Sequence, residues 1–192
     1  MDGAGQVAGG HAVLAACFAL YLVWWCIFFR PGEVRPQGAL RVFGIGCIVA
    51  AVVLGAAGIA LCCSGISRLP QRIVTLRTWH IVLIGIAAYV ALFVITTVSF
   101  DRPPTTELVL IVGWLTLEAA TVNSLYGSGV LGPGAALALL IAMIALAALS
   151  MVCYVRFYSL QGWASLIDGS VPLACGIVYT VVIAVVVLAA VR

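Results

Sequence analysis

The chain has 192 residues, of which 65% are hydrophobic and only 8% are charged, and its net charge is +3. A soluble domain carries about 25% charged residues and about 45–50% apolar ones. A soluble fold of this size cannot hide so many apolar side chains from water, so the composition predicts a protein solvated by the lipid bilayer. The basic residues are all Arg and lie between apolar runs, which argues against a nucleic-acid partner.

Six apolar runs are long enough to cross the ~30 Å hydrocarbon layer, which takes about 20 helical residues. Polar, Pro or Gly residues separate one run from the next. None of the runs alternates in the way that a membrane β-strand does. The predicted fold class is therefore all-α, a polytopic six-transmembrane-helix bundle that forms a single integral membrane domain over residues 1–192. The predicted spans are 11–29, 40–63, 79–100, 107–126, 134–158 and 171–191.

The first span is predicted to be retained, because no positive charge precedes it and no small-residue cleavage site follows it. The two histidines, His11 and His80, are expected at the starts of the first and third spans, on the same side of the membrane. Two such side chains can act as axial ligands, so a haem or redox protein is one hypothesis, although no cofactor is indicated by any other motif.

Two connections are long enough to hold more than a turn. Residues 67–77 carry Arg68, Arg72 and Arg77 at a spacing that favours a short helix in the headgroup layer. The connection 159–170 is interpreted in the same way. Asp168, like the pair Asp101 and Arg102, is expected to be a solvated loop charge.

The two halves of the chain can be superposed as three spans each, with similar Pro/Gly loops at 36–39 and 132–135. Because three is odd, a true repeat would be inverted across the membrane, as in many secondary transporters. The possible 3+3 inverted repeat competes with a simpler explanation, since helices rich in Ala, Val and Leu resemble one another by composition alone.

Glu118 is the most informative residue, because it is an acid near the middle of the fourth predicted span. A carboxyl group at that depth is costly and usually faces the bundle interior or a wet cavity. Helical spacing places Trp114 and Thr121 on its face. These residues predict a substrate- or ion-binding site; the alternative is a neutral carboxyl that fixes the position of the helix.

Asn123 lies on a different face of the same span and is included in the predicted substrate- or ion-binding set. Its alternative role is helix association, which polar side chains support in membranes. Small residues at four-residue spacing, such as Ala12 with Ala16 and Gly46 with Ala50, predict close helix packing within the chain. The same ridges fit a homo-oligomer or a membrane partner subunit.

No arrangement of a nucleophile and a base, no zinc-protease motif and no phosphate loop occurs, so neither catalytic nor metal-binding residues are predicted and an enzyme is not favoured. The seven cysteines lie within apolar runs as small hydrophobes; the adjacent pair Cys62 and Cys63 is the one candidate for redox chemistry. In length and span number the chain is similar to the substrate-binding subunits of energy-coupling-factor importers.

The leading hypothesis is a small-molecule or ion transporter, or its membrane substrate-binding subunit, located in the cell membrane. The absence of Lys favours a GC-rich genome, and hence a bacterial plasma membrane. The alternative is a non-catalytic membrane anchor or stabilising subunit of a larger complex.

Overall fold

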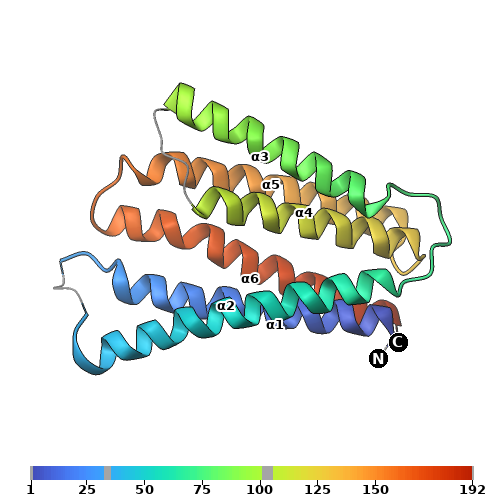
Figure 1. The fold of residues 1–192 in the computed structure, drawn as a ribbon, viewed down its shortest axis with the longest axis horizontal. Coiled ribbons are helices and arrows are strands. Elements are labelled where there is room, and N and C mark those ends of the chain that lie inside the picture. Colours follow the sequence, from blue (N-terminus) through green and yellow to red (C-terminus); the bar gives the residue numbers. More distant parts are fainter. Residues whose placement is uncertain (1, 33–35, 101–105, 192) are drawn as a thin grey trace.

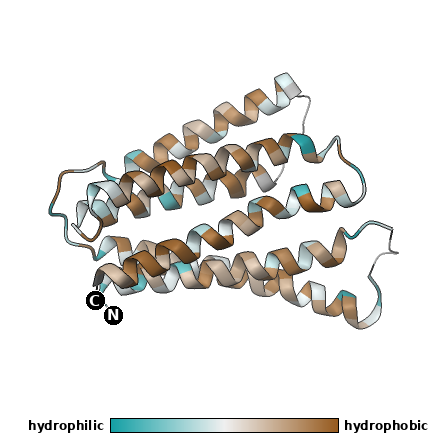
Figure 2. Cartoon of the chain, turned by 180° about the vertical axis from the view of Figure 1, so that it is seen from behind, coloured by the Kyte–Doolittle hydropathy of each residue, from teal (hydrophilic) through white to brown (hydrophobic). Residues whose placement is uncertain are grey.

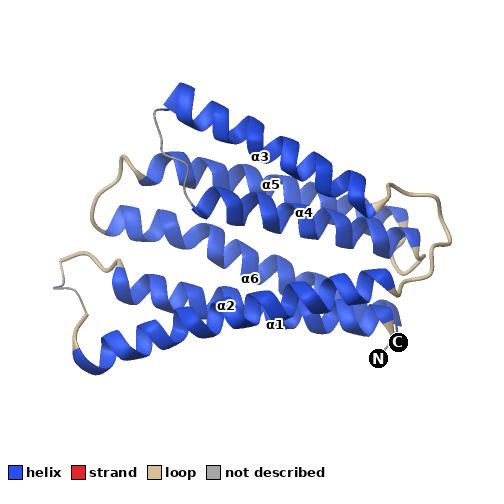
Figure 3. Cartoon of the chain, viewed as in Figure 1, coloured by secondary structure: helices blue, strands red, loops and turns tan. Residues whose placement is uncertain are grey.

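The computed structural model describes residues 2–32, 36–100 and 106–191, and within them it contains six α-helices and no strand (Figure 3). Asp101 and Arg102 lie outside the described residues. The all-α prediction is confirmed. The helices are α1 (Gly3–Phe28), α2 (Gly38–Ser67), α3 (Thr78–Phe100), α4 (Thr106–Gly127), α5 (Pro133–Phe157) and α6 (Trp163–Val191).

All six helices are long and apolar enough to cross a membrane, which makes the chain a multi-pass membrane protein. Their outer faces carry exposed aliphatic side chains, such as Val42 and Val98, which are 71% and 78% exposed. Figure 2 shows that hydrophobic residues occur along the length of the helices. The two ends of the chain lie at the same end of the bundle, called here the terminal end, as six crossings require (Figure 1).

Two helices, α1 and α4, each pack against two neighbours, and they run in opposite directions (Figure 1). α1 packs against α2 and α6, and α4 packs against α3 and α5. α5 and α6 also pack together, whereas α2 and α3 make no comparable contact. α4 is the most buried and the least hydropathic of the six, and α3 is the least buried. Two polar side chains of the fourth span, Glu118 and Thr121, are buried in the protein interior.

α1 begins at Gly3 and not at residue 11 as predicted. Asp2 caps the helix, because its carboxylate accepts a 2.8 Å hydrogen bond from the N–H of Gly5. The first turns are rich in Gly, which lowers their apolar content. For this reason the sequence pattern did not predict them as part of the first span. His11 therefore lies well inside the helix, and its predicted place at the end of a span is wrong.

α6 also starts earlier than predicted, at Trp163 instead of residue 171. Pro172 is typical of a first helical turn, but the helix continues through it. The side chain of Trp25 on α1 donates a 3.1 Å hydrogen bond to the carbonyl of Leu166 and so fixes this early segment. Asp168 is consequently a buried side chain on a helix, and its assignment as a solvated loop charge is wrong.

The connection between α2 and α3, residues 68–77, is named the strap. It contains no helix, so the predicted interfacial helix is wrong. The backbone N–H groups of Arg72 and Ile73 donate to the carbonyl of Gly127 at 2.8 and 2.9 Å. These bonds use a carbonyl at the end of α4 that has no partner within its own helix. The strap is thereby attached to α4.

Glycines bring α1 and α2 into close contact. A Cβ atom added to Gly65 would lie 2.7 Å from the carbonyl oxygen of Gly3 and 2.8 Å from the backbone nitrogen of Val7. Gly10 and Gly58 meet about two turns further along the same interface. Small residues at a helix contact let the backbones approach closely in membranes. This interface sets the position of α1, and hence of His11.

We expect Gly65→Ala to destabilise the protein by about 1–3 kcal/mol, because the added methyl group would overlap backbone atoms that cannot move independently. The measurement is the free energy of unfolding in mixed micelles. Gly46→Ala is the matched control, since a Cβ atom there meets nothing within 4 Å. Equal stability of the two variants would contradict the close α1–α2 contact.

Candidate functional site

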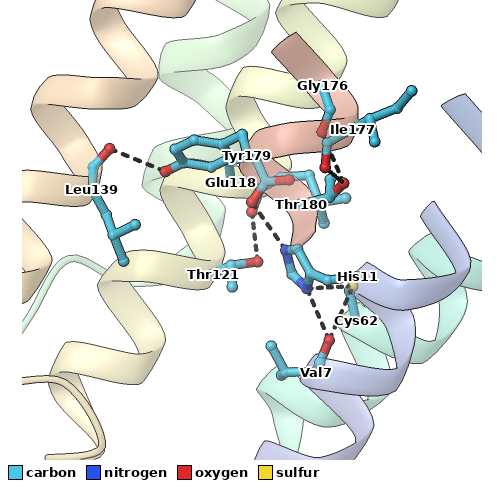
Figure 4. Close-up of polar contacts among 11 residues, drawn as sticks. Val7, His11, Cys62, Glu118, Thr121, Leu139, Gly176, Ile177, Tyr179 and Thr180 are labelled. Atoms are coloured by element: carbon cyan, nitrogen blue, oxygen red, sulfur yellow. Dashed lines mark hydrogen bonds and ion pairs between the residues drawn. The ribbon is translucent and has the colours of Figure 1, made fainter. Parts of the chain in front are cut away.

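The candidate site is a contact between His11 of α1 and Glu118 of α4. The Nε2 atom of His11 lies 3.0 Å from Oε2 of Glu118, and both side chains are 0% exposed (Figure 4). The two residues are far apart in sequence and come from the two helices that organise the bundle. The contact has the geometry of a salt bridge.

The hydrogen bonds of His11 fix its tautomer. Its Nδ1 atom lies 2.8 Å from the carbonyl oxygen of Val7, one turn earlier on α1. A carbonyl only accepts, so Nδ1 must carry the hydrogen. The bond between Nε2 and Oε2 of Glu118 then needs one further proton. That proton resides either on the imidazole, giving an ion pair, or on the carboxyl, giving two neutral groups; both forms have zero net charge.

The two residues of the pair lie at similar distances from the terminal end of the bundle. His11 is eight residues after Gly3, the start of α1, and Glu118 is nine residues before Gly127, the end of α4. A rise of 1.5 Å per residue places both about 12–14 Å from the terminal end of their helices. This distance is close to half the thickness of a hydrocarbon layer, which is about 30 Å. Glu118 thus lies well away from both ends of α4, and its depth in the membrane stays a prediction.

Cys62 of α2 is the third polar side chain at the site. Its Sγ atom lies 3.4 Å from Nδ1 of His11 and 4.0 Å from the carbonyl oxygen of Val7 (Figure 4). Gly10 makes room for this sulfur, since a Cβ atom there would lie 2.5 Å from it. Cys62 and Cys63 do not act as a unit, because Cys62 is buried and Cys63 is exposed.

Trp114 lies one turn from Glu118 on α4, as the sequence predicted. Its ring makes edge-to-face contacts with Phe18 of α1 at 6.4 Å and with Tyr179 of α6 at 5.4 Å between centroids. Both Nε1 of Trp114 and Oε1 of Glu118 are buried without a hydrogen-bond partner among the described residues. The site therefore retains one free donor and one free acceptor.

Thr121 is also buried beside Glu118 (Figure 4). Its hydroxyl donates to the carbonyl of Leu117 within α4 at 2.9 Å. Tyr179 and Thr180 of α6 complete the polar surroundings. The hydroxyl of Tyr179 donates to the carbonyl of Leu139 at 3.1 Å, and that of Thr180 donates to the carbonyl of Gly176 at 2.8 Å.

Asn123, the fourth predicted site residue, lies apart from this group. Its amide donates 2.8 Å to the carbonyl of Leu76 and 3.5 Å to the hydroxyl of Thr75, both in the strap. The structure thus brings Glu118, Trp114 and Thr121 to one site, and it places Asn123 where it attaches the strap to α4. This contact fits the helix-association alternative better than ligand binding.

Sequence reasoning missed His11, Cys62 and Tyr179 as members of the site. The signal for His11 was Asp2, whose capping role lengthens the first helix toward the N-terminus. Both ring nitrogens of His11 are engaged within the bundle, and His80 stacks on Trp79 at 3.6 Å. This arrangement counts against a bis-histidine haem. The described residues contain no group of three His, Cys, Asp or Glu side chains suited to a metal ion.

The comparisons with known proteins give no relative. No protein-family model matches the chain, and neither a curated protein nor a solved structure is significantly similar to it. Function is therefore inferred from the geometry of the site.

A double-mutant cycle tests the contact. We expect His11→Leu and Glu118→Leu each to lower the free energy of unfolding, because each leaves a buried polar partner unsatisfied, at a cost of about 1–3 kcal/mol. The double variant should lose less free energy of unfolding than the two single variants lose together, with a coupling energy of about 0.5–3 kcal/mol. The control cycle combines Glu118→Leu with Asn123→Leu, which should be additive. A coupling energy of zero between His11 and Glu118 would contradict the contact.

Proposed function

We propose that the protein is a small proton-coupled transporter of the cell membrane, or the membrane substrate-binding subunit of one, and that the His11–Glu118 pair is its proton-binding element. The observation that carries the proposal is the full burial of a histidine and a carboxyl in direct contact, about 12–14 Å along their helices from the terminal end. Ionisable residues at this depth are costly and commonly mark ion pathways and proton relays.

The charge of the pair explains why its proton is coupled to helix movement. With one shared proton the pair is neutral. Removal of that proton leaves a carboxylate facing the lone pair of Nε2, and addition of a second proton leaves a buried cation. Either change places an uncompensated charge in a low-dielectric interior, which is strongly unfavourable. The proton count therefore changes when α1 and α4 separate enough to admit water.

The arrangement of the helices supports this mechanism. α1 packs with α2 and α6, and α4 packs less closely with α5 and α3, so the two antiparallel helices have corresponding neighbours. This is the pairing that a 3+3 inverted repeat would produce, with the His11–Glu118 contact at the junction of the two halves. In transporters with such repeats, one half moves against the other around a central site. The α5–α6 contact departs from this symmetry, since α2 and α3 have no equivalent one.

A membrane anchor or stabilising subunit is the second candidate. It is favoured by α3, which is the least buried helix and packs mainly on α4. An anchor does not need a proton-binding pair, so the two candidates differ in the behaviour of Glu118.

The test is proton flux into liposomes that contain the purified protein and a pH-sensitive dye. A potassium gradient with valinomycin sets an inside-negative potential, which drives protons inward. We expect the wild-type protein to acidify the lumen several times faster than protein-free liposomes. Glu118→Gln should reduce the rate to that of protein-free liposomes, because an amide cannot take up or release the proton.

Arg41→Gln is the control, since Arg41 is an exposed residue at the opposite end of the bundle and should leave the flux unchanged. A difference infrared spectrum after a pH change supplies a second measurement: a carboxyl band that is lost in Glu118→Gln identifies the titrating group. Equal flux in wild type and Glu118→Gln would overturn the proposal and favour the anchor.

A further inference from the structure

Two buried polar atoms at the candidate site have no hydrogen-bond partner among the described residues: Nε1 of Trp114, which is a donor, and Oε1 of Glu118. In either form of the His11–Glu118 pair the shared proton lies between Nε2 and Oε2, so Oε1 is an acceptor. Trp114 and Glu118 are four residues apart on α4, which places their Cβ atoms about 5–6 Å apart on one face of the helix. A buried donor or acceptor without a partner is costly in free energy. The site therefore needs a partner for each atom.

The side chains around Glu118 cannot supply that partner. The hydroxyl groups of Thr121, Tyr179 and Thr180 donate to backbone carbonyls at 2.9, 3.1 and 2.8 Å. A hydroxyl group has a single hydrogen, so each of these donors is already engaged. His11 is engaged at both ring nitrogens. The donor to Oε1 must therefore come from outside these four side chains.

The chemistry of the two atoms and the side chains around them define the guest. Trp114 packs edge-to-face against Phe18 and Tyr179, and Figure 4 shows Tyr179 beside Glu118. A molecule enclosed by these side chains must be small, and it must accept a hydrogen bond from the indole and donate one to the carboxyl. A metal ion or an ammonium ion has no lone pair for the indole N–H. Water provides both functions and commonly bridges buried polar groups in this way.

We propose that one water molecule is bound between Trp114 and Glu118, where it accepts from Nε1–H and donates to Oε1. Trp114 is then a positioning residue, because its N–H holds the oxygen of this water. The water is also the group through which Glu118 exchanges protons, since Oε2 faces His11. A proton that arrives as hydronium moves to Oε1 and leaves neutral water behind, and the reverse step releases it. This role in proton exchange rests on the proposed function, whereas the bound water does not.

Solid-state NMR in lipid bilayers tests for the water directly. The protein carries ¹⁵N in its tryptophan rings, and magnetisation is transferred from water protons to the indole N–H groups over a short mixing time. We expect strong transfer to Nε1 of Trp114, whose signal is identified by its loss in Trp114→Phe. Trp25 is the internal control, because its N–H donates to the carbonyl of Leu166 at 3.1 Å. Transfer to Trp114 that is no stronger than transfer to Trp25 would overturn the proposal.

Glu118→Leu tests the second partner of the water. A leucine side chain cannot accept a hydrogen bond, so we expect transfer from water to Trp114 to fall several-fold, while transfer to Trp25 stays the same. Unchanged transfer to Trp114 would mean that the water does not bridge to Glu118, which contradicts the proposal. The comparison of Trp114 with Trp25 in the wild-type protein decides the matter even if this variant fails to fold.

Trp114→Phe tests the role of the water in proton exchange. Phenylalanine keeps an aromatic ring beside Phe18 and Tyr179 but has no N–H to hold the water. In the liposome assay we expect several-fold lower proton flux than in wild type. The infrared band of the Glu118 carboxyl group should also shift to higher frequency, because Oε1 loses a hydrogen bond. Trp79→Phe is the matched control, since Trp79 is 53% exposed on the first turn of α3.

These outcomes separate the bound water from proton transport. Wild-type flux that is unchanged in Trp114→Phe would overturn the role of the water in proton exchange. If the wild-type protein carries no flux, proton transport is overturned, and transfer from water to Trp114 still confirms the bound water.

Discussion

The structure depends on one hydrogen bond between α1 and α4 in a medium that contains no water to replace it. His11 and Glu118 are both fully buried, and each is the hydrogen-bond partner of the other. In hydrocarbon, apolar side chains gain little by leaving lipid for protein, so packing and polar contacts carry much of the association between helices. The contact between His11 and Glu118 therefore fixes how α1 and α4 meet.

The glycines of α1 and α2 make this contact possible. Where Gly10 and Gly58 pass each other, the backbones approach closely enough to bring Cys62 to the imidazole. The carbonyl of Val7 then holds Nδ1, which turns Nε2 toward α4. The orientation of a single ring thus follows from the spacing of glycines on one helix pair, and a larger residue there would move the ring away from Glu118.

Much of the fold could be predicted from the sequence, because hydrocarbon imposes a minimum span length on every crossing. The burial of Glu118 followed from the cost of a charge in lipid, and its neighbours on α4 followed from helical spacing. His11 could not be placed so easily. Glycine-rich turns appear too polar for a span, although their missing side chains are what lets α2 pack there. The sequence pattern placed Asp168 in a loop, because Pro172 is typical of the first turn of a helix.

The most direct test of the central contact is a solid-state NMR distance measurement in lipid bilayers. His80→Gln leaves His11 as the sole histidine, so that ¹⁵N-histidine and ¹³C-glutamate labelling reports on one imidazole. The contact predicts strong dipolar dephasing between Nε2 of His11 and the carboxyl carbon of Glu118, and its loss in Glu118→Leu. Absence of dephasing at Nε2 in the protein with Glu118 intact would contradict it.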